Sequence, residues 1–250
     1  MRSKVSIQKL TMSYYLKDRV VTALNGIDLE IADGEFLVVV GLSGCGKTTL
    51  LNILAGFIKP TGGEILLDGK PIAQAGLMNR GVVFQEYALF PWRTALQNVE
   101  FGLEMKGVDR KNRREIALKY LDLVHLTNFT NIYPHHLSGG MKQRVAVARA
   151  YAYEPEFMLM DEPFGALDAQ TRESLQALTV EVWQKTRKTI FYVTHNIGEA
   201  VYLADRIIVL AGQPGRIYKE IRVDLPRPRD SFDPRYVELE RETTRAVRQG

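Results

Sequence analysis

The chain has 250 residues, a formal net charge of +4 and a single cysteine. Its hydrophobic share of 46% and charged share of 25% are ordinary for a globular protein, and one cysteine excludes an internal disulfide and a cysteine-built metal site. The weak positive charge identifies no class of partner. The start, MRSKVSIQKL, does not resemble a signal peptide, and every apolar run is far shorter than the ~20 residues of a membrane-spanning helix. We therefore expect a cytoplasmic protein.

The first expected elements are antiparallel strands over 4–15 and 21–35, with turns at Asn25-Gly26 and Asp33-Gly34. Short apolar runs bounded by glycine or charge then predict buried strands at 36–41, 81–85, 157–162, 189–195 and 206–212. Helical patterns at 47–57, 141–153 and 168–187 lie between them. Strands that alternate with helices predict an α/β fold with a mainly parallel sheet, preceded by an antiparallel β subdomain.

Residues 95–133 interrupt this alternation. RKNRREIALKYLDLVHL, from Arg110, has apolar side chains at helical spacing, and no strand is expected before 157. We therefore expect a helical subdomain over 87–153, inserted into a catalytic core of 1–86 and 154–225. The basic cluster at its start resembles a solvated first turn more than a nucleic-acid patch, because aromatic residues are not interleaved with it. The tail, 226–250, is expected to be an extended linker and a short polar helix.

GLSGCGKT, from Gly41 to Thr48, matches the phosphate-loop pattern and lies between a predicted strand and a predicted helix. Glycines let backbone N–H groups surround phosphate oxygens at the N-terminus of a helix. Lys47 would reach the β- and γ-phosphates, and Thr48 would offer its hydroxyl to Mg²⁺. Cys45 is expected to pack inside the loop and not to act in redox chemistry. The predicted phosphate-binding residues are Gly41, Leu42, Ser43, Gly44, Cys45, Gly46, Lys47, Thr48 and Thr49.

Two acids end the apolar run FMLMDE, which places them at the carboxyl end of a buried strand. Asp161 would hold Mg²⁺ through water, and Glu162 would orient and deprotonate an attacking water, because phosphoryl transfer to water needs a positioned base. His195 ends the next apolar run, TIFYVTH, from which it could bond the γ-phosphate. The other histidines are expected to be structural.

HHLSGGMKQR, residues 135–144, contains a second anion-binding pattern. Ser138 and the backbone N–H groups near Gly140 would lie before a helix at 141–153, whose N-terminus favours negative charge. Taken alone, this stretch would be interpreted as a helix cap without a ligand. One small chain thus holds two loops suited to phosphate.

These motifs occur in the order found in the nucleotide-binding subunits of ATP-binding-cassette (ABC) transporters, which the chain resembles over nearly its whole length. The motifs are the phosphate loop, VVFQ with Gln85, LSGGMKQR, FMLMDEP, GALD with Asp168, and YVTH with His195. The resemblance implies a P-loop NTPase (RecA-like) core with ATP and Mg²⁺ as cofactors. It also implies a head-to-tail dimer, in which Ser138, Gly139 and Gly140 of one subunit close over the γ-phosphate of ATP held by the other.

Further roles follow from the same resemblance. Gln85 would contact Mg²⁺ or the attacking water, Asp168 would lie at the dimer interface, and Tyr14, with Tyr15 as a rival, would stack on adenine. Met141 stands where the family usually has glutamine, which removes a side-chain hydrogen bond but keeps the backbone donors. The implied catalytic residues are thus Glu162, His195, Gln85 and Lys47, and the implied metal ligands are Thr48, Gln85 and Asp161.

A single cassette without a membrane span resembles the ATPase subunits of bacterial importers, whose pore is formed by separate permease subunits. EYALFPWRTALQNVEFGL, residues 86–103, would receive a permease helix through Phe90 and Trp92, unless these aromatics pack inside the insert. The chain would then work at the cytoplasmic face of the inner membrane, and indirectly with an extracytoplasmic solute-binding protein.

Several stretches, among them FPWRTALQNVEFGL, THNIGEAVYLADRIIVL and GQPGRI, resemble the ATPases of nitrate, sulfonate and taurine importers. A soluble ABC-type ATPase acting on nucleic acid or ribosomes is the alternative, but such relatives tend to carry two cassettes or coiled-coil insertions. A P-loop kinase is disfavoured by LSGG and by a glutamate placed to activate water. No nucleic-acid partner is expected.

Overall fold

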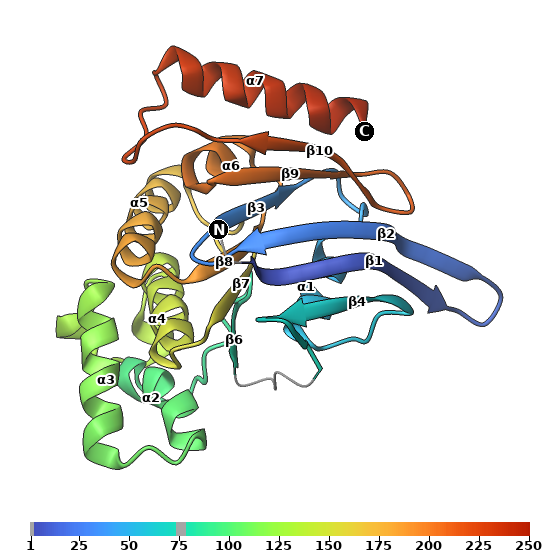
Figure 1. The fold of residues 1–250 in the computed structure, drawn as a ribbon. Helices are drawn as coiled ribbons and strands as arrows, with labels where there is room; N and C mark the ends of the chain where they lie inside the picture. The colour runs from blue at the N-terminus through green and yellow to red at the C-terminus, as the bar shows by residue number, and fades with distance from the viewer. Residues whose placement is uncertain (1–2, 74–78) are drawn as a thin grey trace.

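The structure is a computed structural model that describes residues 3–73 and 79–250. It contains a six-stranded sheet, a four-stranded antiparallel sheet and helices packed against them (Figure 1). In the described ranges, no helix has the length and apolar character needed to cross a bilayer. The helices are α1 (Lys47–Ala55), α2 (Ala95–Met105), α3 (Arg110–Leu123), α4 (Gly139–Ala152), α5 (Ala169–Thr186), α6 (Ile197–Leu203) and α7 (Pro234–Gln249), with 3-10 turns η2 (Thr127–Phe129) and η3 (Pro134–His136).

The six-stranded sheet has the order β10-β9-β3-β8-β7-β6. Every residue of its central strands β3 and β8 is buried, which explains why the sequence shows continuous apolar runs there. The predicted parallel strands and the α/β fold are confirmed. An antiparallel edge strand, β10, has no counterpart among the predictions because most of its side chains are polar and exposed. The strands are β3 (Phe36–Val40), β6 (Arg80–Val83), β7 (Phe157–Asp161), β8 (Thr189–Val193), β9 (Arg206–Ala211) and β10 (Arg216–Arg222).

Side chains from the two faces of this sheet enter different cores, because successive strand residues point to opposite faces. Leu37 and Val39 of β3 pack in one core with α1 and the antiparallel sheet. Val38 and Val40 pack in the other core with side chains of α4, α5 and α6. The two glycine-rich loops of the sequence therefore lead into helices on opposite faces of one sheet.

The N-terminal strands form the second sheet, with the order β2-β1-β4-β5. A hairpin turn at 16–19 joins the long strands β1 and β2, so the predicted turn at Asn25-Gly26 is wrong. This dipeptide lies inside β2, where Gly26 has a φ of 65° beside an irregular register near Leu10, as in a β-bulge. The turn at Asp33-Gly34 does form. The strands are β1 (Ser3–Tyr15), β2 (Val20–Ala32), β4 (Gly62–Leu67) and β5 (Lys70–Pro71).

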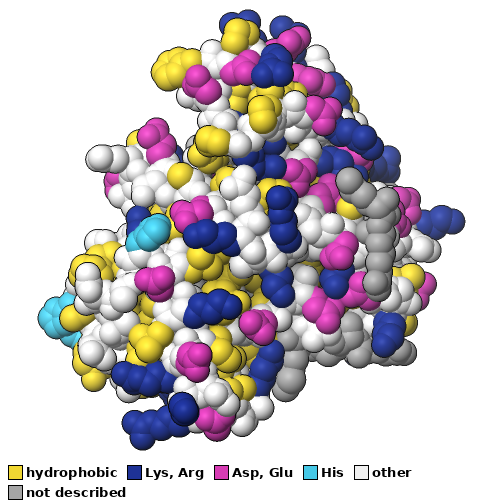
Figure 2. Space-filling view, turned by 60° about the vertical axis from the view of Figure 1, so that its left-hand side comes forward, with side chains coloured by type: hydrophobic (Ala, Val, Ile, Leu, Met, Phe, Trp, Pro, Cys, Tyr) yellow, Lys and Arg dark blue, Asp and Glu magenta, His cyan; other side chains and the backbone are white. Residues whose placement is uncertain are grey.

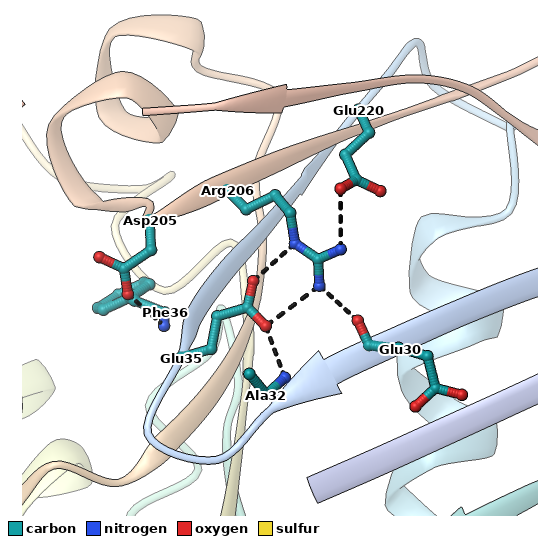
Figure 3. A network of polar contacts seen from close by, with 7 residues as sticks. All are labelled: Glu30, Ala32, Glu35, Phe36, Asp205, Arg206 and Glu220. Carbon is teal, nitrogen blue, oxygen red and sulfur yellow. Dashed lines mark hydrogen bonds and ion pairs between the residues drawn. The ribbon is translucent and has the colours of Figure 1, made fainter. Parts of the chain in front are cut away.

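Arg206, at the start of β9, joins the two sheets (Figure 3). Its guanidinium donates to the Glu35 carboxylate at 2.7 Å and to the Glu220 carboxylate at 3.0 Å. It also donates to the backbone carbonyl of Glu30 in β2. Glu35 in turn accepts a bond from the Ala32 amide at 2.7 Å. These contacts fix the connection between β2 and β3, and so the start of the strand that leads to the phosphate loop.

Helices α2, α3 and α4 all lie in the range predicted to be a helical insert, between the neighbouring parallel strands β6 and β7. They contact one another and form the lower left of Figure 1. The basic cluster Arg110, Lys111, Arg113 and Arg114 occupies the first turn of α3, as predicted. Asp109 caps this helix by accepting bonds from the backbone amides of its first turn.

The C-terminal helix differs from its prediction. Instead of a short polar helix, α7 has 16 residues and buries Tyr236, Thr243 and Ala246. It contacts α6, β9 and β10, and Figure 1 shows it lying across this end of the molecule. Charged residues dominate its sequence, PRYVELERETTRAVRQ, so the sequence pattern does not reveal the few side chains that pack against the rest of the protein.

Candidate active site

The carboxyl ends of four parallel strands form the edge at which the predicted catalytic residues gather. The phosphate loop begins at Gly41 directly after β3, His195 lies two residues after β8, Glu162 follows β7, and Gln85 lies two residues after β6. These strands are consecutive neighbours in the sheet. Residues far apart in the sequence therefore meet at one edge, where open α/β sheets bind ligands.

The loop between β3 and α1 has a conformation that requires glycine. Gly44 and Gly46 have φ angles of 83° and 97°, in the left-handed region. A Cβ on Gly46 would lie 2.6 Å from Cδ2 of Leu24, and a Cβ on Gly41 would lie 2.1 Å from the carbonyl oxygen of Leu210. The loop backbone thus closes tightly ahead of a helix N-terminus, which is the geometry of a phosphate cradle.

Lys47 lies inside this loop and is only 7% exposed. Its ammonium donates to the carbonyl oxygens of Gly41 at 2.8 Å and Leu42 at 3.0 Å. Both hydrogen-bond acceptors are neutral carbonyls, and the nearby Asp161 carboxylate interacts with the positive charge of Lys47, which can also attract an anion. Around it Leu42, Ser43 and Gly44 form an exposed rim.

Cys45 is a buried member of the same loop. Burial raises the pKa of its thiol, and the nearby charge of Lys47 opposes this only in part. Because the thiolate is the reactive form, a raised pKa leaves the side chain inert at neutral pH. The environment of Cys45 thus supports the predicted packing role.

Asp161, the last residue of β7, lies beside Thr48 of the phosphate loop. Burial raises the pKa of Asp161 above its ordinary value, and the Glu162 carboxylate adds to the rise. A hydrogen bond with the Thr48 hydroxyl and the charge of Lys47 act in the opposite direction. Carboxylate and hydroxyl oxygens are suitable ligands for Mg²⁺, and a divalent cation would compensate the buried negative charge. The pair therefore fits the predicted metal site.

Glu162 and His195 contact each other directly, with 2.7 Å between Oε2 and Nδ1. Glu162 has a φ of 42°, an uncommon conformation for a residue with a side chain. The Gln85 amide and the Glu162 carboxylate border the same small volume, because their Nε2 and Oε2 atoms lie 3.3 and 3.8 Å from where a Cβ on Gly165 would stand. The sequence predicted each residue separately, and the structure adds the contact between the acid and the histidine.

Tyr14 is the better placed of the two candidate tyrosines at the end of β1. Its hydroxyl lies 3.4 Å from Oγ1 of Thr49 in α1, and its ring is partly open to solvent at 37% exposure. Tyr15 is 76% exposed and, as the next strand residue, points to the other face of the sheet. Only Tyr14 therefore borders the phosphate loop with an accessible ring face.

The remaining predicted residues form a separate group at the N-termini of α4 and α5. Ser138 caps α4 by accepting a bond from the Met141 amide at 3.3 Å, and Asp168 caps α5 by accepting one from the Thr171 amide at 3.0 Å. The two caps are close, because a Cβ on Gly140 would lie 2.6 Å from Cγ2 of Thr171. The helices that this group caps, α4 and α5, pack on the sheet face opposite α1, the helix that follows the phosphate loop.

The start of α4 also corrects the predicted helix boundary. Gly139 and Gly140 are its first two residues, whereas the sequence placed them before a helix that began at Met141. Ser138 is a favourable cap, and its bond fixes the first turn two residues earlier. Gly139 packs closely within the chain, since a Cβ there would lie 2.9 Å from the hydroxyl of Tyr87 and would displace that side chain. The Met141 amide is taken by Ser138, whereas the amides of Gly139 and Gly140 precede the first intrahelical hydrogen bond and suit an anion.

Comparison with known proteins assigns this arrangement to a family. The model of the ABC transporter family matches residues 24–165, a span that holds the phosphate loop, the Ser138 cap and both acids at the end of β7. The chain belongs to the ABC transporter family. An uncharacterized ABC transporter ATP-binding protein of Methanocaldococcus jannaschii is 52% identical over 238 residues, covering 95% of this chain and 89% of the relative.

The relatives of the chain include proteins whose names state a transported solute. The nitrate import ATP-binding protein NrtD of a Synechocystis strain is 48% identical, over 89% of this chain and 83% of its own length. The taurine import ATP-binding protein TauB of Burkholderia pseudomallei is 44% identical, over 95% of this chain and 94% of its own length. ATP-binding proteins of ABC transporters are ATPases, so the predicted enzyme class is confirmed.

Solved ABC structures share the fold. A dimeric bacterial ABC transporter cassette is 35% identical, with a TM-score of 0.77 over 89% of this chain and all of that one. A post-hydrolysis state of the same cassette is bound to ADP and Pi. The cbiO1 protein of Clostridium perfringens, part of the ABC transporter complex cbiONQ, has a TM-score of 0.81 at 28% identity over 100% of this chain and 96% of that one. The predicted P-loop NTPase fold is thereby confirmed, and the chain is a nucleotide-binding protein.

The predicted permease-docking region of this ABC transporter subunit forms a groove of about 460 Å³. Trp92 lines the groove and is 71% exposed, whereas Phe90 is only partly exposed and packs on Phe101 with 4.5 Å between ring centroids. Of the two aromatics predicted to receive a permease helix, Trp92 is thus accessible to a partner and Phe90 packs mainly inside the insert. Among the other lining residues are Glu100 and Arg113. Figure 2 shows the face that carries the helical insert, where hydrophobic side chains lie among charges of both signs.

Two residues that were not predicted support the phosphate loop and the segment that follows Gln85. A Cβ on Gly215, in the turn between β9 and β10, would lie 2.0 Å from the carbonyl oxygen of Cys45, so this turn backs the phosphate loop. Arg149 of α4 donates to the carbonyl oxygens of Ala88 at 2.6 Å and Tyr87 at 3.2 Å, just after Gln85. GQPGRI drew attention to Gly215 only as a point of family resemblance, and nothing in the sequence marked Arg149.

Proposed function

We propose that this chain is the ATP-hydrolysing subunit of an ABC importer, which energises uptake of a small solute through a separate membrane permease. One observation carries the proposal at this site. The Glu162–His195 pair lies beside the Thr48–Asp161 pair, at the sheet edge that also carries the phosphate loop. A base, a partner for it and a metal-ligand pair next to a phosphate cradle are the parts needed to hydrolyse a nucleoside triphosphate.

Mg²⁺ fits the donors that the chain presents. Thr48 and Asp161 would hold it, with Gln85 as a third ligand or as a contact to water. When bound, the cation supplies compensation for the charge that develops on the phosphate oxygens.

The chain's own residues would then divide the work of ATP hydrolysis. Lys47 and the loop amides bind the β- and γ-phosphates, and Tyr14 supports adenine. Glu162 accepts a proton from the attacking water as general base. His195, held by that carboxylate, reaches the γ-phosphate and keeps Glu162 oriented.

The second residue group completes the site in a dimer. Ser138, Gly139 and Gly140 would bind the γ-phosphate of ATP held by another copy, and Asp168 would lie at the interface. Two features support this arrangement: the group contacts its own chain's α5, and it lies on the sheet face opposite α1. A solved relative is a dimeric cassette.

The remaining partners follow from the helical insert and from the relatives. Residues 87–153 would form a subdomain that docks the permease at Trp92, inserted in a core of 1–86 and 154–225. The chain would thus lie at the cytoplasmic face of the inner membrane and serve a solute-binding protein only indirectly. The names of the nitrate and taurine import relatives support a small anion of the nitrate, sulfonate and taurine class.

The test combines turnover with partner capture. Purified chain is expected to release phosphate slowly from Mg-ATP without an acceptor, and Glu162→Gln is expected to abolish release. The tagged chain, pulled down from its native membranes, is expected to recover a multi-span permease, with Trp92→Ala as the matched control. Recovery of ribosomes or DNA instead would overturn the transport function while leaving ATP hydrolysis in place.

A further inference from the structure

The position of His195 depends on the helix that follows it. Its side chain is 62% exposed, so packing does not hold it. The adjoining backbone is instead bonded to the first turn of α6. Asn196 accepts a bond from the Glu199 amide at 3.0 Å, its own amide donates to the Thr194 hydroxyl at 3.0 Å, and that hydroxyl donates to the buried Glu199 carboxylate. A shift of α6 would therefore move His195 relative to Glu162.

The C-terminal tail holds α6 from the other side. The Tyr236 hydroxyl donates to the carbonyl oxygen of Gly198 at 2.7 Å. The Arg229 guanidinium donates to the carbonyl oxygens of Val201 at 2.7 Å and Tyr202 at 3.0 Å. Arg227 likewise donates to the carbonyl oxygen of Leu203, the last residue of α6. Three tail side chains thus bind four backbone carbonyls of a helix that has only seven residues.

The arginine contacts, to Val201, Tyr202 and Leu203, suit the chemistry of a helix end. The last carbonyls of a helix have no partner within it, and cationic groups are favourable there. Arg229 is only 7% exposed and also donates to the carbonyl oxygens of Val223 and Leu225 in the preceding chain segment. Burial lowers its pKa to about 10, so the guanidinium remains charged at neutral pH. A planar group with five N–H donors can hold several carbonyls at once.

The same tail is also tied to the central strand. Arg227 donates to the Asp205 carboxylate at 2.6 Å, and that carboxylate accepts a bond from the Phe36 amide at 2.9 Å. Phe36 begins β3, whose far end leads into the phosphate loop. Asp205 and Phe36 appear side by side in Figure 3. The tail therefore bridges α6 and the strand that carries the loop.

We propose that the tail, residues 226–250, is a positioning element for ATP hydrolysis, in which Tyr236 and Arg229 hold α6 and thereby keep His195 against Glu162. This inference rests on the catalytic roles given to Glu162 and His195 under the proposed function. Tyr236 and Arg229 act through α6, so they are positioning residues. A misplacement of about 1 Å at a reacting group can cost about 100-fold in rate, so small contacts of this kind suffice.

The test uses the full chain with Tyr236→Phe, which removes one hydroxyl and keeps the ring. We expect the kcat of ATP hydrolysis to fall about 10-fold with KM within about twofold, because orientation is lost and nucleotide binding is not. Arg229→Lys keeps the positive charge but loses the planar guanidinium with its several N–H donors, so it should also lower kcat. Glu242→Gln is the matched control, since it breaks the 2.9 Å ion pair between α7 and Lys219 of β10 on the side away from α6.

Two readouts separate positioning from general stabilisation. In a His195→Ala background, Tyr236→Phe should cause no further loss in single-turnover hydrolysis, because coupled residues are not additive. Hydrogen exchange of the α6 amides should rise in Tyr236→Phe and stay unchanged in Glu242→Gln. A full further loss in the His195→Ala background, or a wild-type kcat in Tyr236→Phe, would overturn the proposal. If the wild-type chain releases no phosphate, the proposed function fails, and unchanged α6 exchange in Tyr236→Phe would overturn the tail's role independently.

Discussion

Gly215→Ala tests whether the turn between β9 and β10 shapes the phosphate loop. The φ of Gly215 is not in the left-handed region, so alanine is compatible with its backbone. The added Cβ would lie 2.0 Å from the Cys45 carbonyl oxygen, and real Cβ contacts essentially never fall below 3.0 Å, so the turn or the loop must move by about 1 Å. Overpacking of this kind costs about 1–3 kcal/mol. If the loop takes up the shift, ATP affinity should fall about 10- to 100-fold, the equivalent of about 1.4–2.8 kcal/mol.

The assay is calorimetric or fluorescent titration with Mg-ATP, about 20 °C below the melting temperature of the variant, so that unfolding does not contribute. Gly62→Ala is the control, because its Cβ would meet only Cβ of Thr11, at 3.8 Å, in an ordinary contact. If Gly215→Ala binds ATP within twofold of Gly62→Ala and remains folded, the turn yields without disturbing the loop. The structural reasoning about its support would then be wrong.

Three further predictions concern the active site and the groove. Glu162→Gln should keep ATP binding while its rate of hydrolysis falls at least about 100-fold. With Mg-ATP it should elute as a dimer in size-exclusion chromatography. Elution as a monomer would contradict an ATP site formed by two subunits. Trp92→Ala should leave ATP binding unchanged but weaken co-purification with the permease, and unaltered recovery would remove its docking role. Asp161→Asn should abolish the Mg²⁺-dependent part of the thermal shift caused by ATP. Because burial raises the pKa of Asp161, its ionised form is unfavourable in the folded chain. At a pH above the raised pKa of Asp161, the nucleotide-free variant should thus have a higher melting temperature than wild type. This difference in melting temperature should vanish as the pH falls through that pKa. A lower melting temperature than wild type at pH 8 would show that Asp161 is not destabilised by burial.

The sequence predicted the central sheet well because its strands are buried on both faces. Such strands appear as short apolar runs, and β3 and β8 are cases in which every side chain is buried. Elements with one exposed face were harder to predict. The edge strand β10 buries only Ile221, and α7 conceals its packing stripe among charges. The turn predicted at Asn25-Gly26 was wrong for another reason, since a dipeptide typical of turns can also form a bulge inside a strand.

At the site, the sequence named residues whose chemistry is carried by their own side chains. The contact between Glu162 and His195 depends on strand order, which residue spacing does not reveal. Supporting residues such as Gly215 and Arg149 are invisible for a similar reason. Their importance lies in which backbone they touch, and both touch loops that are distant in the sequence.

The connection between β6 and β7 has a consequence for how chains of this architecture can diversify. These strands pair directly, with Val83 opposite Met160, so the sheet is complete whatever joins them. Everything from α2 to α4 is carried by that single link, including the groove at Trp92. Helices α2 and α3, whose residues line the groove, can therefore change without altering this strand pairing, whereas α4 also presents Ser138, Gly139 and Gly140 of the predicted ATP site.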